Sequence, residues 1–173
     1  MNNIGELYLD MDGVLVGFFE GADPILEAAG FPKFMDDYWQ QFGQDRADDI
    51  RWAVIKQTPN FWANLPYLPD GMRLWNYCYY KQPNILTAEQ RRTPDCHDGK
   101  LQWINKHLDF KYINKVHIVK RSEKKNYALN SGIRNVLVDD YAFNCQEWEE
   151  AGGIAIHHTS TQNTIKELQK LGI

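Results

Sequence analysis

Two aspartates separated by one residue follow a short apolar segment near the start of this sequence. Asp10 and Asp12 come directly after the apolar residues at 7–9, and Gly13 then allows the chain to turn away sharply. Two carboxylates this close cannot both stay ionised at low cost unless a cation neutralises them or one of them holds a proton. Because aspartate and glycine also favour turns, the pair by itself is equally consistent with a solvated turn.

A second acidic pair favours the chemical interpretation. Asp139 and Asp140 follow the apolar segment at residues 136–138, and a hydroxyl side chain, Thr87, ends another apolar segment at residues 84–87. If these segments are strands of one parallel sheet, their carboxyl ends meet at the same edge. A cluster of carboxylates repels itself, and a hard dication with oxygen ligands, Mg²⁺ in particular, is the usual remedy.

A basic stretch follows a further apolar segment. Residues 120–125 read KRSEKK and come directly after the segment at 116–119. Carboxylates, a dication, a hydroxyl and an ammonium group at one edge suit phosphoryl transfer, in which the charge on the phosphoryl oxygens must be neutralised. Three lysines, at positions 120, 124 and 125, are candidates for this ammonium group.

The elements that must hold these residues alternate along the chain. Apolar segments predict strands at residues 7–9, 84–87, 116–119, 136–138 and 154–156. Segments with helical periodicity predict helices at residues 98–109, 142–151 and 161–171. This alternation favours a Rossmann-like, doubly wound α/β fold with a mostly parallel sheet covered on both faces. Functional residues in such folds gather at the carboxyl ends of the strands, which is where both acidic pairs are expected.

Residues 18–80 differ from the rest of the chain. They contain no convincing strand and hold 15 of the chain's 23 aromatic residues. They also carry nine acidic and five basic residues, so the whole net charge of −4 falls in this segment. We therefore expect a core formed by residues 1–17 and 81–173, with a mainly helical cap inserted at residues 18–80.

The bulk composition limits the class of protein. The 173 residues are enough for one domain with a sizeable core, and three scattered cysteines outside any CxxC spacing argue against a disulfide scaffold. The sequence starts without the features of a signal peptide, and no apolar run approaches the roughly 20 residues that span a bilayer. We expect a soluble cytoplasmic protein that has no membrane partner. The negative net charge makes nucleic acid an unfavourable partner as well.

The motifs, taken together, resemble those of the haloacid dehalogenase (HAD) superfamily of phosphohydrolases. DMDGV, ILTA, a lysine near 124 and VLVDDY follow one another between residues 6 and 141, in the order and strand context of the four family motifs. The resemblance implies that Asp10 is a nucleophile that forms an aspartyl-phosphate, and that Asp12 is the general acid and base. Aspartate at this second position is typical of the phosphatases of the family, whereas its transport ATPases have threonine there.

The resemblance also implies roles for the other motif residues. Thr87 would hold a phosphoryl oxygen, and Lys124, whose spacing to Tyr127 is frequent in such proteins, would neutralise the charge of the intermediate. The Mg²⁺ ligands would be Asp10, the backbone carbonyl of Asp12, and Asp140, with Asp139 in support.

Within this superfamily the chain is similar to the 5′(3′)-deoxyribonucleotidases, whose C1 cap occupies the position of residues 18–80. Phe18 matches a phenylalanine that stacks on the nucleobase, and Trp39 is the candidate for an aromatic partner in the cap. Lys100 matches a lysine that opens the helix after the second motif and helps to hold the phosphate. The resemblance therefore implies a deoxyribonucleoside monophosphate as the substrate, because stacking on aromatic rings tolerates several bases.

Other interpretations stay open. Aromatic residues at helical spacing are more often core than ligand contacts, so Phe18 and Trp39 are also consistent with the core of the cap. After Thr87 the sequence reads Ala-Glu-Gln-Arg-Arg instead of continuing with the Ser-Pro of that group, which leaves the phosphate contacts on this side undefined. The alternative substrates are phosphate groups at nucleic acid ends and other small phosphorylated metabolites. A non-catalytic binding domain is a further alternative, against which the intact acidic pairs argue.

Overall fold

The computed structural model describes residues 4–108 and 115–173. These residues divide into two compact units. The first, which we call the α/β unit, contains residues 4–16, 67–89 and 115–173, and the second, the helical unit, contains residues 17–66 and 90–108. Residues 18–66 of the predicted cap lie in the helical unit, and residues 67–80 lie in the α/β unit.

The α/β unit is built on a sheet in which five strands run parallel. They are β1 (Ile4–Leu9), β2 (Asn84–Ala88), β3 (Val116–Val119), β5 (Ile133–Asp139) and β6 (Ile154–His157). Their spatial order is β3-β2-β1-β5-β6. The chain therefore builds outward from β1 first on one side and then on the other, which makes the boundary between β1 and β5 the topological switch point. The predicted doubly wound fold and all five predicted strands are confirmed.

A short hairpin precedes β5. Strand β4 (Leu129–Asn130) pairs antiparallel with the start of β5 across Ser131 and Gly132, which both have positive φ, 51° and 81°. Positive φ at both turn residues is the signature of the tight hairpin turn that matches the twist of paired strands. This strand is not apparent from the sequence, because two residues are too few to show a periodicity.

The register of β1 against β5 is fixed by a buried asparagine. Where the pairing of the two strands shifts, the backbone N–H of Glu6 donates to Asn135 Oδ1 at 2.8 Å, and Asn135 Nδ2 donates to the carbonyl of Tyr127 at 2.8 Å. Gly5 is needed at this point because a β-carbon there would collide with the Asn135 side chain. From Leu7 onward the pairing of β1 with β5 is regular, so the carboxyl ends of the two strands lie side by side.

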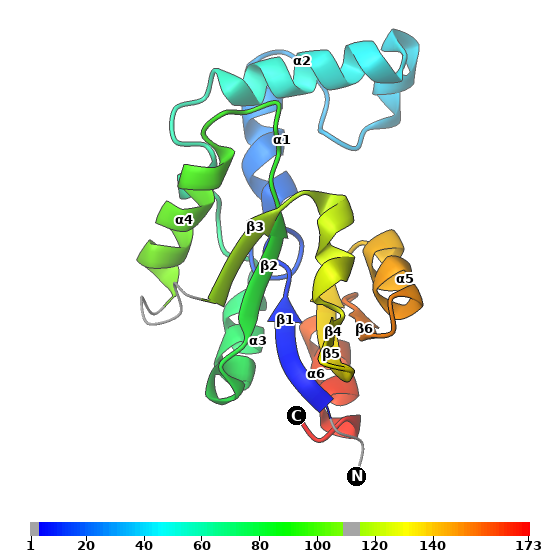
Figure 1. Cartoon of the computed structure of the whole chain (residues 1–173). Coiled ribbons are helices and arrows are strands. Elements are labelled where there is room, and N and C mark those ends of the chain that lie inside the picture. The colour runs from blue at the N-terminus through cyan, green and yellow to red at the C-terminus, as the bar shows by residue number, and fades with distance from the viewer. Residues whose placement is uncertain (1–3, 109–114) are drawn as a thin grey trace. The chain divides into compact units, whose positions relative to one another are not determined.

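Helices cover both faces of the sheet. Trp148 of α5 (Ala142–Glu150) packs on Tyr8, Leu86 and Leu137 of the strands. Figure 1 shows α3 (Gly71–Cys78) and α6 (Thr161–Lys170) side by side on the opposite face. The short turns η3 (Tyr79–Lys81) and η5 (Arg121–Tyr127) lead into β2 and away from β3. The predicted helices at 142–151 and 161–171 are thus confirmed to within one residue.

The helical unit contains α1 (Phe18–Ala28), α2 (Gln44–Lys56) and α4 (Cys96–His107), together with the short turns η1 (Asp37–Phe42) and η2 (Trp62–Asn64). Leu26, Trp39 and Ala47 form the centre of one core cluster, and aromatic rings surround it. Gly99 lets α4 approach η2, since a β-carbon there would lie 2.6 Å from Trp62. Helix α4 begins two residues earlier than the predicted helix at 98–109, and residue 109 lies outside the described residues.

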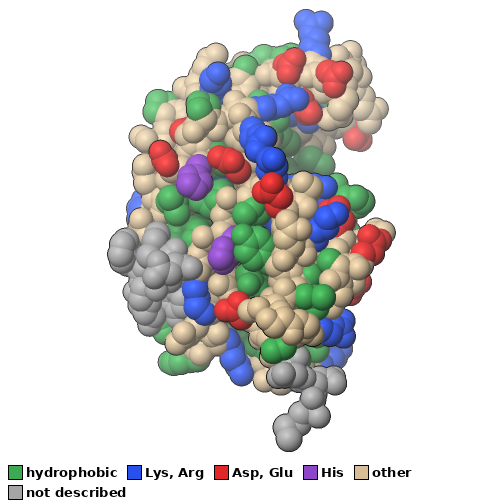
Figure 2. Space-filling model, viewed as in Figure 1, with side chains coloured by type: hydrophobic (Ala, Val, Ile, Leu, Met, Phe, Trp, Pro, Cys, Tyr) green, Lys and Arg blue, Asp and Glu red, His purple; other side chains and the backbone are tan. Residues whose placement is uncertain are grey.

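Charged side chains are spread over the surface. Among the described residues on the face drawn in Figure 2, acidic and basic side chains are interspersed and do not form a continuous basic surface. None of the helices within residues 4–108 and 115–173 is long and apolar enough to cross a lipid bilayer.

Candidate active site

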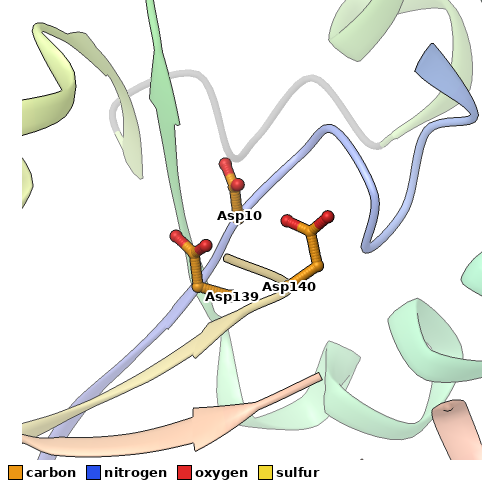
Figure 3. Close-up of side chains that lie close together, drawn as sticks. All are labelled: Asp10, Asp139 and Asp140. Atoms are coloured by element: carbon orange, nitrogen blue, oxygen red, sulfur yellow. The ribbon is translucent and has the colours of Figure 1, made fainter. Parts of the chain in front are cut away.

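Three aspartates meet at the switch point between β1 and β5. Asp10 follows β1, Asp139 ends β5 and Asp140 follows it, and each offers a carboxylate oxygen within 4.8 Å of the others (Figure 3). The sheet places them there, because Leu9 lies opposite Val138 in the parallel register of the two strands. The crevice outside the carboxyl ends of strands at a switch point is where ligands bind in open α/β sheets.

The ammonium group of Lys124 reaches into this acidic cluster. Its Nζ lies 2.9 Å from Asp10 Oδ1 and 2.8 Å from Asp139 Oδ2, and the lysine is only 3% exposed. Burial by itself lowers the pKa of a lysine, but the two carboxylates outweigh that effect and hold the pKa of Lys124 above its usual value. Lys124 is therefore a permanent positive charge beside Asp10.

The other two candidate lysines lie on the surface. Lys120 pairs with Glu123 at 3.5 Å and Lys125 pairs with Glu147 at 3.6 Å, both as exposed side chains. Of the three candidates, the structure brings Lys124 to the aspartates. The reason is the geometry of η5, whose turn after β3 directs one side chain of this segment inward.

Asp139 is fully buried and surrounded by hydrogen-bond donors. Its Oδ1 accepts the backbone N–H of Tyr141 at 2.9 Å, and its Oδ2 accepts the Lys124 ammonium at 2.8 Å. The amide nitrogen of Asn144 donates to both carboxylate oxygens, at 3.0 Å each. Since protein donors already occupy both oxygens, Asp139 acts in this arrangement as a holder of Lys124.

The cluster raises the pKa of Asp140. Although the residue as a whole is exposed, the cluster displaces water from its carboxyl group. This desolvation, together with the negative charges of Asp10 and Asp139, raises the pKa of Asp140 to about 7, and the charge of Lys124 offsets the effect only in part. Carboxylates that repel one another in this way are suited to share a divalent cation.

Gly13 keeps the loop after β1 close to this carboxyl group. Its φ is +75°, and a β-carbon at this position would collide with the carboxyl group of Asp140. Next to it, the backbone N–H groups of Leu15 and Val16 both donate to the carbonyl of Met11 at 2.9 Å, which closes the turn that contains Asp12. Glycine is therefore required here both for its backbone conformation and for the space it leaves. Asp12 lies half-buried in this turn.

Thr87 lies on the neighbouring strand at the same edge. It is fully buried, and because Leu9 of β1 is opposite Ile85 of β2, Asp10 is level with Leu86 and Thr87 lies one residue beyond it. The α/β unit by itself therefore carries six of the predicted site residues. Asp12 lies in the turn after β1, and the five at or next to this edge are Asp10, Thr87, Lys124, Asp139 and Asp140.

Phe18, Trp39 and Lys100 belong to the helical unit. Phe18 is half-buried at the start of α1, with five aromatic rings at centroid distances of 5.3 to 5.9 Å. Trp39 is only 2% exposed, stacks on Phe31 at 5.8 Å and donates its indole N–H to the carbonyl of Lys33 at 2.7 Å. These contacts are those of core side chains, most clearly for Trp39.

Lys100 is also buried. This residue of α4 has no exposed surface, and its Nζ lies 5.1 Å from the centre of the Trp62 ring, which is a cation–π distance. The indole N–H of Trp62 donates in turn to Thr93 Oγ1 at 3.0 Å. The aromatic neighbour thus gives the buried ammonium group a favourable interaction within the helical unit.

Two residues beside the aspartates, Asn144 and Arg121, are not among the site residues predicted from the sequence. Asn144 donates to Asp139, and Arg121 donates to Asn144 Oδ1 at 3.1 Å. One signal was available, because Asn144 and Trp148 are four residues apart on the helix that follows β5 and therefore share its inner face. A polar residue on the inner face, next to an acidic pair, is a candidate partner for that pair.

The comparisons with known proteins bear on the fold. No family model matches the sequence, and no curated protein sequence matches it either. Solved structures of HAD-like hydrolases do match. A haloacid dehalogenase-like hydrolase from Streptococcus pneumoniae is 13% identical, with a TM-score of 0.58 over 90% of this chain and 84% of that one.

Two further neighbours extend this result. L-2-haloacid dehalogenase from Xanthobacter autotrophicus is 14% identical, with a TM-score of 0.55 over 98% of this chain and 83% of that one. A HAD family hydrolase from Deinococcus radiodurans R1, with bound phosphate and sodium, is 13% identical, with a TM-score of 0.50 over 90% and 80%. The α/β fold described above is therefore that of the HAD-like hydrolases.

Proposed function

We propose that this chain is a phosphohydrolase of the HAD superfamily that cleaves phosphate monoesters through an aspartyl-phosphate on Asp10. The observation that carries the proposal is the cluster of Asp10, Lys124, Asp139 and Asp140 at the switch point of the sheet. The fold of HAD-like hydrolases supports it, and so does the phosphate bound in one of the similar structures.

The proposed first step forms the covalent intermediate. A carboxylate oxygen of Asp10 attacks the phosphorus atom, the ester P–O bond breaks, and Asp12 gives its proton to the departing oxygen. Lys124 faces the Asp10 carboxylate at 2.9 Å, so its charge lies where the phosphoryl oxygens must be neutralised. Thr87, one residue beyond the level of Asp10, is the proposed hydroxyl donor to a phosphoryl oxygen.

The proposed second step releases phosphate. Asp12 takes a proton from a water molecule, the water oxygen attacks the phosphorus atom, and the bond to Asp10 breaks. The products are inorganic phosphate and the free Asp10 carboxylate, and Asp12 is again protonated for the next cycle. Lys124 holds the Asp10 carboxylate in place as it re-forms, because its charge persists throughout.

The donor set suits a hard divalent cation, and we propose Mg²⁺. Asp10 and Asp140 would hold it with their carboxylates, together with the backbone carbonyl of Asp12. The observation that fits is the pKa of Asp140, which desolvation and the repulsion of Asp10 and Asp139 raise to about 7, because Lys124 leaves part of the negative charge uncompensated. When bound, the ion would supply additional positive charge for the phosphoryl oxygens.

We propose nucleoside monophosphates, deoxyribonucleotides included, as the substrate class. Phe18 supports this assignment, since its ring is only half-buried and can contribute a stacking face, whereas Trp39 is committed to its own core. Lys100 stays a proposed phosphate contact. The acidic balance of residues 18–80 and the interspersed charges in Figure 2 argue against polynucleotide ends.

The proposal is tested by a substrate screen of the purified protein with Mg²⁺. The arms are nucleoside monophosphates, sugar phosphates, 3′-phosphorylated oligonucleotides and an L-2-haloacid. We expect phosphate release to be fastest from the nucleoside monophosphates. Turnover of sugar phosphates alone would overturn the proposed nucleotide substrate but would be consistent with phosphate monoester hydrolysis. Turnover of the haloacid alone would overturn the phosphohydrolase assignment.

A further inference from the structure

A continuous set of hydrogen bonds connects the surface of the α/β unit with the proposed nucleophile. Arg121 Nη1 donates to Asn144 Oδ1 at 3.1 Å, and Asn144 Nδ2 donates to both oxygens of Asp139 at 3.0 Å. Asp139 holds the ammonium group of Lys124 at 2.8 Å, and that group contacts Asp10 at 2.9 Å. Every link lies between residues of one compact unit.

Arg121 decides which way the amide of Asn144 is turned. A guanidinium group can only donate, so the amide oxygen faces Arg121 and the amide nitrogen must face Asp139. The reversed amide would bring its oxygen against the carboxylate and its N–H groups against the guanidinium. Arg121 is itself held from two sides, by Glu147 at 2.6 Å and by the ring of Phe143, whose centre lies 4.9 Å from the guanidinium carbon.

We propose that Asn144 and Arg121 are positioning residues, which hold Asp139 so that it keeps the Lys124 ammonium against Asp10. Asn144 is 6% exposed and uncharged, so its contribution is one of geometry. Without its two contacts Asp139 can rotate, and Lys124 then loses one of the two carboxylates that fix it. A cation that is no longer preorganised stabilises a developing phosphoryl charge less well.

The kinetic part of this inference rests on the proposed function, and the matched pair Arg121→Ala and Lys125→Ala tests it. Both substitutions remove a cation that pairs with Glu147, but only Arg121 also contacts Asn144. Arg121→Ala is expected to lower kcat by about 10-fold with KM within about 2-fold, as is typical when an outer partner of a functional group is removed. Lys125→Ala is expected to keep kcat within about 2-fold.

Two further variants sharpen this test. Asn144→Ala should lower kcat at least as much as Arg121→Ala, and Arg121→Lys, which keeps a donor, should recover part of the loss. Because Arg121 is partly exposed, its variants stay informative even if Asn144→Ala does not fold. Equal losses in Arg121→Ala and Lys125→Ala, an unchanged kcat in Arg121→Ala, or a rise confined to KM would overturn the proposal.

Crystal structures of the two matched variants, without metal or substrate, give a measurement that does not depend on activity. In Arg121→Ala, Lys124 Nζ should move out of hydrogen-bond distance of Asp10, whereas in Lys125→Ala it should stay at the 2.9 Å of the unaltered protein. Lys124 at the same place in both variants would overturn the positioning role. If the unaltered protein hydrolyses no phosphate ester, the proposed function fails, and the position of Lys124 still decides the inference.

Discussion

The two units of this protein bury charge in opposite ways. In the helical unit, the buried guanidinium group of Arg51 lies over the rings of Phe34 and Trp39, at 5.0 and 4.7 Å, and pairs with Asp48 at 3.3 Å. Aromatic faces and a carboxylate thus compensate this single cation. Such an arrangement stabilises a small core and compensates the charge of Arg51 within the unit.

In the α/β unit the charges are brought together and left unbalanced. Three carboxylates lie together, and one ammonium group contacts two of them. Desolvation and the charges of Asp10 and Asp139 raise the pKa of Asp140 to about 7. A chain gains no stability from such an arrangement, and perturbed groups in a crevice are typical of sites that do chemistry. The contrast teaches that electrostatic strain, rather than the number of aromatic or charged residues, distinguishes the site from the core.

The largest expected effect comes from removing the nucleophile. Asp10→Asn should lower kcat for phosphate esters by at least about 10⁴-fold, because no covalent intermediate can form. The amide oxygen can still accept the N–H of Met11, so the fold should persist. Phosphate release and far-UV circular dichroism check the two halves of this prediction. A rate within 10-fold of the unaltered protein would remove Asp10 from its proposed role.

The next largest effect concerns the stability of the helical unit. Trp39→Ala should lower the free energy of unfolding by about 3–5 kcal/mol, since it deletes a buried aromatic side chain from the core of the helical unit. Urea denaturation measures it, with Tyr38→Ala on the same turn as the exposed control, because Tyr38 is 59% exposed. A loss below about 1 kcal/mol, combined with a rise in KM, would identify Trp39 as a ligand contact instead.

The charge imbalance predicts a dependence of stability on pH and metal. Folded Asp140 binds its proton more tightly than the unfolded chain, so the metal-free protein should lose stability as pH rises from about 4 to about 7 and lose no more above that range. Mg²⁺ competes with this proton. At 100 times its Kd it should stabilise by about 2.7 kcal/mol, or roughly 5–10 °C in Tm.

Thermal unfolding at pH 5 and pH 8 measures this effect. The rise in Tm with Mg²⁺ should be larger at pH 8, and Asp140→Asn should remove both the slope with pH and most of the response to the metal. An equal response to Mg²⁺ in the unaltered protein and in Asp140→Asn would place the ion elsewhere.

The smallest expected effect belongs to the proposed base contact. Phe18→Ala should raise KM for nucleoside monophosphates by about 10-fold, the loss of one stacking contact, and should leave KM for p-nitrophenyl phosphate nearly unchanged. Phe19→Ala is the matched control, since Phe19 is the exposed neighbour of Phe18 on α1. Equal changes for both substrates would assign Phe18 to the core of the helical unit.

The strands and the edge that carries the candidate site were predictable because both follow from short-range patterns. Apolar segments of three or four residues predicted the parallel strands, and an acidic residue at the end of a strand must lie at the edge of the sheet. Neighbouring strands then bring Asp10 and Asp139 together without further information. That Lys124, and not its neighbours at positions 120 and 125, points inward depends on the turn of η5, which the sequence pattern does not specify.

The remaining features depend on tertiary contacts. Asn135 is a buried amide whose partner Glu6 lies 129 residues away, and nothing in its local sequence distinguishes it from a surface asparagine. Asn144 has its helical spacing to Trp148 as a signal, but that spacing does not specify that Asp139 is its partner. Trp39 is similar, because an aromatic residue at helical spacing has the same pattern whether it packs in a core or binds a ligand. The division into two units was also not readable, since residues 90–108 join the helical unit although they follow β2.

The central claim is that Asp10 carries the phosphoryl group, and chemical trapping tests it most directly. A turning-over mixture is quenched and reduced with borohydride, which converts an aspartyl-phosphate to homoserine, and the peptide that contains residues 10 and 12 is sequenced by mass spectrometry. We expect homoserine at position 10, with aspartate unchanged at position 12, and no conversion in Asp10→Asn. Steady hydrolysis with conversion at position 12, or with no conversion under conditions in which the intermediate accumulates, would contradict the account.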